Sequence, residues 1–338
     1  MISGQNQSSA PKKILVCRRD NIGDLVLTTP LIAAIIQGHP EALVDVLVHS
    51  YTKEVLEPFP GVRNVFAYTK AKHASGLFQK LRVLKNQLAL YWSLRQEKYD
   101  WLVLVDHARK EKNRWLVAVV RSGCLFALDD QRLTDEKTLL NNVLLSDGLK
   151  KLSRSHETLR ALSLVTLLPG MYHAEVPKIY LSRQLKAVAP VFTVQAGPDS
   201  SHRFHIHLSA RRVKQRWGVD RYVDLTQALL RKYPSAEVAI TWAPGPPDDP
   251  LHPGDDHLAR LLEKQLAEKI GLSSRVDFCR TDDLLALKGV LVCRTLSVCP
   301  DGGAMHLAAG LGVPVVALFG DSPSSRWAPT SPHSLVLQ

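Results

Sequence analysis

The sequence lacks long apolar runs, paired cysteines and a secretory signal, and each absence excludes a class of protein. No run of apolar residues approaches the roughly 20 that a membrane-spanning helix needs. The five cysteines are odd in number and include no C-x-x-C pair, which argues against a disulfide framework and a zinc site. The opening MISGQNQSSAPKK has no apolar core of the kind found in signal peptides. We therefore expect a soluble cytoplasmic protein with reduced thiols.

Acidic residues are missing from a long stretch of the first half of the chain. Residues 58–96 contain no Asp or Glu. Residues 1–187 hold 27 Lys and Arg against 17 Asp and Glu, a net charge of +10, whereas residues 188–338 hold 16 against 15. Such a one-sided charge attracts phosphates or an anionic membrane surface. The basic half has no interleaved aromatic stacking motif, so we expect no nucleic-acid partner.

A basic amphipathic helix is predicted inside this acid-free stretch. Leu77, Leu81, Leu84, Leu88 and Tyr91 recur at helical spacing among several lysines and arginines. For this helix alone, the sequence favours a solvated basic face whose apolar side packs into the core.

The alternation of apolar runs and helical patterns predicts an α/β protein. A chain of 338 residues is too long for one core and is expected to form two domains. Strands that alternate with helices imply parallel sheets. We predict two doubly wound, Rossmann-like domains facing a cleft, at residues 1–185 and 186–338, divided in the polar stretch 181–190. The expected strands are 12–17, 44–48, 101–105, 192–194 and 238–242, and the expected helices include 222–230 and 258–270.

Residues 296–320 read as strand, glycine loop, helix, turn and strand. The loop Pro300-Asp301-Gly302-Gly303 is expected to need unusual backbone angles, and its glycines let the backbone approach a ligand. The N–H groups that open the following helix suit an anion. An ordinary tight loop without a ligand fits the same geometry equally well.

A second strand–loop–helix unit lies near the start of the chain. The strand is followed by the polar loop Arg18–Asp24 and then by a helical pattern. That helix begins either at Gly23-Asp24 or at Thr29-Pro30. In both cases Asp24 lies at the mouth of a strand-to-helix connection, where open α/β sheets bind their ligands.

Three segments resemble motifs of the heptosyltransferase family of lipopolysaccharide synthesis, glycosyltransferase family nine. RRDNIGDLVLTTPLIAAI resembles its N-terminal motif, VKQRWGVDRY its basic-tryptophan segment, and CPDGGAMHLAAGLGVPVVALFG with the later Trp-Ala-Pro its donor motif. The resemblance implies a GT-B fold, with the acceptor bound by the first domain and an ADP-sugar by the second. It also implies metal-independent, inverting transfer of heptose to the phosphorylated inner core. Gly302 departs from the usual Ser or Thr of the family, and Gln215 from a frequent Lys.

Transfer without a metal needs a base for the acceptor hydroxyl and cations or N–H groups for the leaving diphosphate. The sequence contains no Asp-x-Asp metal motif, so we expect neither a metal nor a cofactor. Asp24 matches the position of the family's proposed base, and helix capping is a compatible second role. The expected donor-binding residues are Lys214, Arg216, Asp301, Gly302, Gly303, Ala304, Met305, His306 and, from the loop after strand 238–242, Asp249, with Asp248, Asp255 and Asp256 equally eligible. The expected acceptor-binding residues are Arg18, Asn21, Gly23, Lys80, Arg82, Lys85 and Arg109.

The expected partners are a nucleotide-sugar donor, an anionic glycolipid acceptor and, peripherally, the cytoplasmic face of the inner membrane. Two other functions remain open. One is a nucleotide-sugar epimerase on the same architecture, and the other is a non-catalytic binder of anionic glycolipid or nucleic acid.

Overall fold

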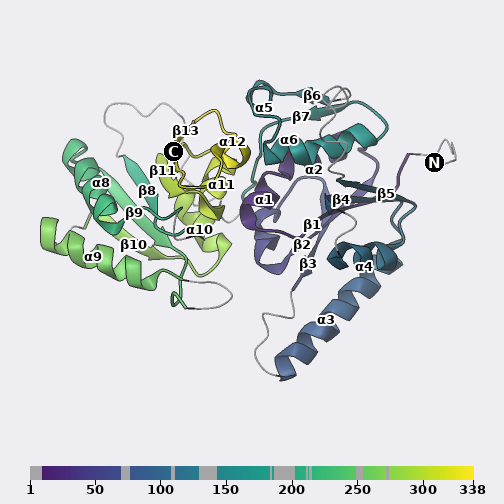
Figure 1. Ribbon diagram of the computed structural model, residues 1–338, viewed down its shortest axis with the longest axis horizontal. Helices are drawn as coiled ribbons and strands as arrows, with labels where there is room; N and C mark the ends of the chain where they lie inside the picture. The colour runs from purple at the N-terminus through teal and green to yellow at the C-terminus, as the bar shows by residue number, and fades with distance from the viewer. Residues whose placement is uncertain are drawn as a thin grey trace. The chain divides into compact units, whose positions relative to one another are not determined.

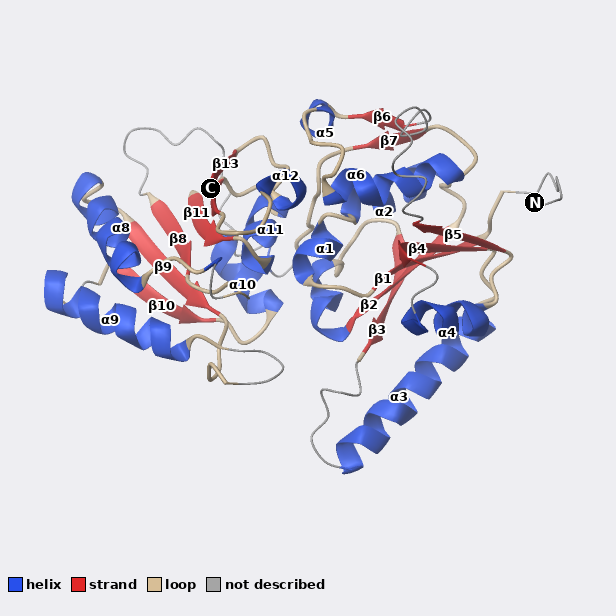
Figure 2. Cartoon of the chain, in the orientation of Figure 1, coloured by secondary structure: helices blue, strands red, loops and turns tan. Residues whose placement is uncertain are grey.

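The chain divides into two compact units, residues 1–175 and 176–338. The division falls before the polar stretch 181–190, in which the sequence places the boundary. The computed structural model (Figure 1 and Figure 2) describes residues 10–69, 77–107, 111–128, 143–182, 185, 202–210, 212, 215–248, 254–271 and 274–338.

The first unit is built on a five-stranded parallel sheet in the order β3-β2-β1-β4-β5. Its central strands are runs of Val, Ile and Leu that are buried on both faces, as parallel sheets require. The strands are β1 (Lys13–Arg18), β2 (Leu43–His49), β3 (Val62–Tyr68), β4 (Trp101–His107) and β5 (Cys124–Leu128).

Helices cover both faces of this sheet (Figure 1). On one face, Leu94 of α3 and Leu116 of α4 pack with Leu15, Leu102 and Leu104 of the sheet. The other face carries α2 and α6. The helices are α1 (Ile22–Val26), α2 (Thr29–Gly38), α3 (Leu77–Gln96), α4 (Glu111–Val120), α5 (Asp147–Lys150) and α6 (Glu157–Leu162), with the 3-10 turns η1 (Ser50–Val55) and η4 (Ser163–Leu167) and a small parallel pair β6 (Val143–Leu145) and β7 (Tyr172–Ala174).

The second unit holds a six-stranded parallel sheet in the order β10-β9-β8-β11-β12-β13. This order is that of a doubly wound nucleotide-binding sheet, in which ligands meet the carboxyl ends of the strands. The strands are β8 (Arg203–His207), β9 (Glu237–Trp242), β10 (Val276–Arg280), β11 (Leu296–Pro300), β12 (Val315–Leu318) and β13 (Ser334–Leu337), and the helices are α8 (Val219–Lys232), α9 (Asp256–Ile270), α10 (Leu284–Leu291), α11 (Gly303–Gly310) and α12 (Ser324–Trp327).

The predicted α/β class with parallel sheets is confirmed, as are the helices expected at 222–230 and 258–270. The strand expected at 192–194 lies outside the described residues, and β8 was not predicted. None of the helices in the described part of the chain has the length and apolar character that a membrane crossing requires.

A chain of buried polar side chains crosses the middle of the second sheet. His205 is fully buried, with Nδ1 2.6 Å from Ser297 Oγ and Nε2 2.8 Å from Thr241 Oγ1. His207 Nδ1 lies 2.8 Å from the same threonine oxygen, and Cys299 Sγ lies 3.1 Å from Ser297 Oγ. Burial lowers the pKa of both histidines, that of His207 to about 4.

These histidines should make the second unit less stable in acid. The unfolded histidines take up protons near pH 6.5, whereas folded His207 stays neutral down to about pH 4. Between these values the unfolded state binds more protons, so the free energy of unfolding should fall as the pH drops, by up to about 1.4 kcal/mol per pH unit for each histidine. Urea unfolding between about pH 4.5 and 7 should show a shallower pH dependence for the H205Q/H207Q double variant than for the wild type. Equal slopes in the two proteins would refute this expectation.

Candidate active site

The loop after β1 leads into two short helices rather than one. Both helix starts that the sequence leaves open are used, since α1 begins at Ile22 and α2 at Thr29. Asp24 is the third residue of α1, and its Oδ2 accepts hydrogen bonds of 3.1 Å from the backbone N and from the Nδ2 of Asn21. Asp24 therefore caps the helix, as one of its two expected roles requires.

A buried arginine holds the other oxygen of this carboxylate. The Arg18 side chain is 4% exposed, and its Nη2 donates to Asp24 Oδ1 at 2.8 Å and to Glu157 Oε1 at 3.0 Å. Its Nη1 donates to the carbonyl of Val105 at 3.0 Å, and its Nε lies 3.2 Å from Asp20 Oδ2. Burial alone would lower the pKa of this guanidinium, but the three carboxylates outweigh it and the pKa is raised. Arg18 is thus a permanent cation that fixes the Asp24 side chain.

Glu157, which sequence analysis missed, completes this cluster. Its side chain is 1% exposed at the first residue of α6, and Arg160 Nη1 donates to its Oε1 at 3.3 Å. The residue is separated from Arg18 by 139 positions and belongs to no motif. A buried carboxylate requires a partner, but a sequence does not reveal which acidic residues are buried.

Arg19 connects the same loop to α4 and β3. Its Nη2 donates to Asn113 Oδ1 of α4 at 2.7 Å, and its guanidinium carbon lies 5.1 Å from the ring centroid of Tyr68. The Tyr68 ring contacts Tyr91 of α3, which packs edge-to-face on Trp115 of α4 with centroids 4.8 Å apart. The loop therefore contacts α4 directly through Asn113, and it is linked to α3 through Tyr68 and Tyr91.

The residues expected to bind the acceptor fall into two groups. Arg18 at the end of β1, Asn21 before α1 and Gly23 in α1 lie near Asp24 in sequence, whereas Arg82 and Lys85 are exposed on α3. Arg109 and the side chain of Lys80 lie outside the described residues.

In the second unit, the glycine loop joins β11 to α11. Gly302 has φ 167° and ψ −173°, an extended conformation open to any residue, so the expectation of unusual backbone angles is wrong there. A Cβ at Gly302 would meet its nearest neighbour, the carbonyl oxygen of Pro300, at an ordinary 3.9 Å. The backbone therefore does not demand this glycine, whose missing side chain leaves free space beside Asp301.

Asp301 accepts two hydrogen bonds on one oxygen. Gln215 Nε2 donates to its Oδ2 at 2.8 Å, and Ser322 Oγ donates to the same atom at 2.6 Å. Burial raises the pKa of the Asp301 carboxyl, although the Ser322 bond and the charge of Arg212 act in the opposite direction. Ser322, which sequence analysis missed, thus places a hydroxyl beside the loop in which Gly302 lacks one.

Arg216 is oriented by the loop after β9. Its Nη2 lies 2.9 Å from Asp255 Oδ1, an ion pair without the geometry of a directed hydrogen bond, and its Nε donates to the Ala210 carbonyl at 3.1 Å. Asp256 accepts from Trp242 Nε1 at 2.7 Å and from Arg280 at 3.0 Å. Two of the four carboxylates eligible for a ligand are therefore engaged by the protein itself. Of the remaining expected residues in this region, Asp248 is exposed, and Asp249 and Lys214 lie outside the described residues.

A model of glycosyltransferase family 9 (heptosyltransferase) matches residues 87–338. The chain belongs to this family. It is 25% identical over 315 residues to lipopolysaccharide heptosyltransferase 3 of Escherichia coli strain K12, covering 91% of this chain and 82% of that protein.

Solved structures of heptosyltransferases share the fold. E. coli heptosyltransferase WaaC with ADP matches with a TM-score of 0.71 at 16% identity, covering 96% of this chain and 92% of that one. E. coli ADP-heptose lps heptosyltransferase II matches with a TM-score of 0.66 at 18% identity, covering 96% and 90%. The GT-B fold expected from the motifs is therefore confirmed, and family membership makes the protein a glycosyltransferase.

At the start of α11, the backbone N–H groups rather than the side chains are available to a ligand. The side chains of Ala304, Met305 and His306 are 6%, 0% and 4% exposed. Gly303 is the first residue of the helix, so the N–H groups of its first turn are the atoms available to an anion.

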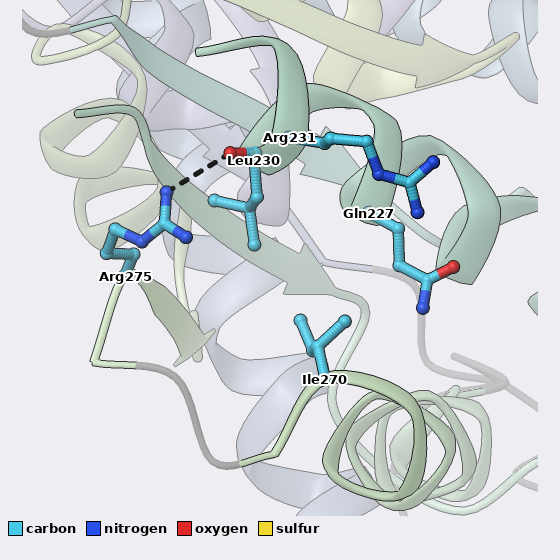
Figure 3. Close-up of a pocket in the computed structure, with 5 residues that line it drawn as sticks. All are labelled: Gln227, Leu230, Arg231, Ile270 and Arg275. Atoms are coloured by element: carbon cyan, nitrogen blue, oxygen red, sulfur yellow. Dashed lines mark hydrogen bonds between the residues drawn. The ribbon is translucent and has the colours of Figure 1, made fainter. Parts of the chain in front are cut away.

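A shallow hollow at the opposite edge of the second sheet does not belong to this site (Figure 3). It lies near the amino ends of the strands, because its residues come from the ends of α8 and α9 and from the turn before β10. Arg275 donates there to the carbonyl of Leu230 and so holds the turn in place. The lining residues are Gln227, Leu230, Arg231, Ile270 and Arg275.

Proposed function

We propose that the protein transfers a heptose from ADP-heptose to a phosphorylated lipopolysaccharide core acceptor, with inversion and without a metal ion. The observation that carries the proposal is Asp24, fixed by Arg18 and Asn21 at the carboxyl edge of the first sheet of a family 9 glycosyltransferase. The names of the relatives support the donor and acceptor, because they are lipopolysaccharide heptosyltransferases and one was solved with ADP.

In the proposed reaction, Asp24 accepts the proton of the attacking acceptor hydroxyl. The acceptor oxygen forms a bond to the anomeric carbon of heptose as the bond from that carbon to the diphosphate oxygen breaks, and attack from the opposite face inverts the configuration. The Asp24 side chain is 12% exposed, and its Oδ1, which accepts one hydrogen bond from Arg18, has a lone pair left for the acceptor hydroxyl. Arg18 keeps the carboxylate in one orientation throughout.

The second unit is proposed to stabilise the departing ADP. Arg216 and Lys214 would supply positive charge, and the N–H groups of the first turn of α11 would meet phosphate oxygens. Asp255 orients the Arg216 guanidinium through their 2.9 Å ion pair. A hydrogen-bonded polar cluster lies beside Gly302 and is proposed to face the donor. It consists of Asp301, Ser322 and Gln215. The ribose is assigned to Asp248 or Asp249, since Asp255 and Asp256 are already paired.

The first unit is proposed to bind the acceptor. Its excess of Lys and Arg suits a lipid-linked, phosphorylated glycan at the cytoplasmic face of the inner membrane. Arg82 and Lys85, together with Lys80 and Arg109, are proposed to meet acceptor phosphates.

An assay with ADP-heptose and acceptor in excess EDTA tests the proposal. We expect glycosylated acceptor and ADP to form only when both substrates are present, and the rate to persist in EDTA because fixed cations and helix N–H groups replace a divalent ion. Release or epimerisation of the sugar without acceptor would instead favour an epimerase, and ligand binding without turnover would favour a binding protein. Loss of activity that magnesium restores would refute metal independence.

A further inference from the structure

Helix α3 is longer than the sheet on which it packs. Its 20 residues span about 30 Å, whereas the seven-residue strand β4 spans about 23 Å. The packing lies in its later turns, where Leu94 is buried and Leu90 and Tyr91 contact the core. The earlier turns project away from the sheet (Figure 1).

The projecting part exposes a stripe of large apolar side chains. Leu81, Leu84, Leu88 and Trp92 are 53%, 50%, 57% and 67% exposed. Their spacing places them along one side of the helix. The sequence-based expectation that the apolar side of this helix packs into the core is therefore wrong for these residues. Single exposed leucines are common, but a continuous exposed stripe marks an interaction site.

Helix α4 extends this stripe with a second tryptophan. Trp115 is 55% exposed and packs edge-to-face on Tyr91 of α3. We refer to Leu81, Leu84, Leu88, Trp92 and Trp115 together as the α3 face.

The positive charge beside the α3 face indicates which kind of partner binds there. Arg82 and Lys85 are exposed on the same projecting turns, and α3 contains no acidic residue. Leucine and tryptophan next to lysine and arginine are the composition of helices that lie in the interface of an anionic bilayer. The apolar groups enter the acyl boundary, and the cations reach the phosphates of the headgroups.

We propose that the α3 face inserts into the surface of an anionic bilayer and anchors the first unit there. The proposal deepens the proposed function, on which it rests for the reason why the protein meets a membrane. A second copy of the chain fits less well, because a symmetric dimer through α3 would bring its cations against one another without a carboxylate from either helix.

The anchor is joined to the candidate active site by direct contacts. Trp115 packs on Tyr91, Tyr91 contacts Tyr68, and Arg19 lies over the Tyr68 ring. Arg19 also holds Asn113 on α4. Insertion of the α3 face would therefore hold the loop of Arg19, and with it the start of α1 that carries Asp24, in a fixed position relative to the lipid surface.

Vesicle binding of the full chain tests the anchor without any turnover. Wild-type protein should sediment with vesicles of phosphatidylcholine and phosphatidylglycerol, and its tryptophan emission should shift to the blue. L81S/L84S/L88S should bind these vesicles about 100-fold more weakly, because the variant lacks three leucine side chains that enter the acyl boundary in the wild type. The control L144S/L335S changes two leucines that are 54% and 57% exposed outside α3, and it should bind like the wild type.

Salt separates the apolar anchor from electrostatic attraction. R82Q/K85Q should lose binding mainly at low salt, whereas the leucine triple variant should also lose the binding that the wild type retains at about 0.5 M salt. Circular dichroism should show that the triple variant is folded, since the three side chains are exposed. Its transfer to a deacylated, soluble acceptor should equal that of the wild type.

Three outcomes would overturn the anchor. They are equal vesicle binding by the triple variant and the wild type, no binding of the wild type to anionic vesicles, and a wild-type dimer in light scattering that the triple variant dissociates. Failure of the wild type to transfer heptose would reject the proposed function and leave the vesicle result standing, so the two failures are distinguishable.

Discussion

Asp24→Asn should reduce turnover by about 10²–10⁴-fold and leave the affinity for the donor within about twofold of the wild type. The amide cannot accept the proton of the acceptor hydroxyl, whereas its oxygen can still accept the hydrogen bond from the backbone N of Asn21 that caps α1. Steady-state kinetics with a saturating acceptor, together with calorimetry of ADP binding, measures the two quantities separately.

Asp20→Asn is the matched control for this variant. Asp20 also lies beside Arg18, 3.2 Å from its Nε, but its side chain is 30% exposed and lies outside α1. The turnover of Asp20→Asn should stay within a few-fold of that of the wild type. Near-normal turnover of Asp24→Asn would remove Asp24 from the mechanism, and an equal loss in both variants would mean that the charge around Arg18 matters rather than the base.

Arg18→Met should cost about 3–5 kcal/mol of unfolding free energy and nearly all activity. The substitution leaves the buried carboxylate of Glu157 without its closest cation, and removal of one partner from a buried ion pair is expensive. Arg160, 3.3 Å from Glu157, offsets part of the loss. Urea unfolding followed by circular dichroism measures the change in stability.

A double variant separates stability from catalysis at this cluster. R18M/E157L replaces the buried pair by apolar side chains and should recover most of the lost stability, because apolar replacements of buried pairs are often neutral. It should not recover activity, since Asp24 remains without Arg18. Wild-type stability of the single variant, or recovered activity of the double variant, would contradict the role given to Arg18.

The strands that could be predicted are buried strands whose sequences consist mainly of consecutive apolar residues. β1 and β4 contain uninterrupted runs, and the runs in β2 and β9 are interrupted only by Asp45 and Thr241. The strand β8, with the sequence RFHIH, could not be predicted, because alternating histidines look polar. The hydrogen-bond partners of His205 are Ser297 on β11 and Thr241 on β9. These strands flank β8 in the sheet, and the strand order cannot be read from the sequence.

The same limit applies to the candidate site. Motif residues such as Asp24 and Asp301 could be located because strand-to-helix loops mark the carboxyl edge of a parallel sheet. Glu157 and Ser322 act on those residues from other elements, and no local pattern links them. Helical spacing likewise identified the apolar side of α3 but could not tell whether anything covers it, since periodicity describes one surface and not its neighbour.

Attachment through the α3 face would change how the enzyme finds its acceptor. A protein held at a bilayer by Leu81, Leu84, Leu88 and the two tryptophans moves sideways with the lipid, so its search for a lipid-linked acceptor is confined to two dimensions. The rate would then follow the mole fraction of acceptor within the bilayer rather than its bulk concentration. Dilution of the acceptor with inert anionic lipid would slow the reaction, while the donor would still arrive from solution in three dimensions.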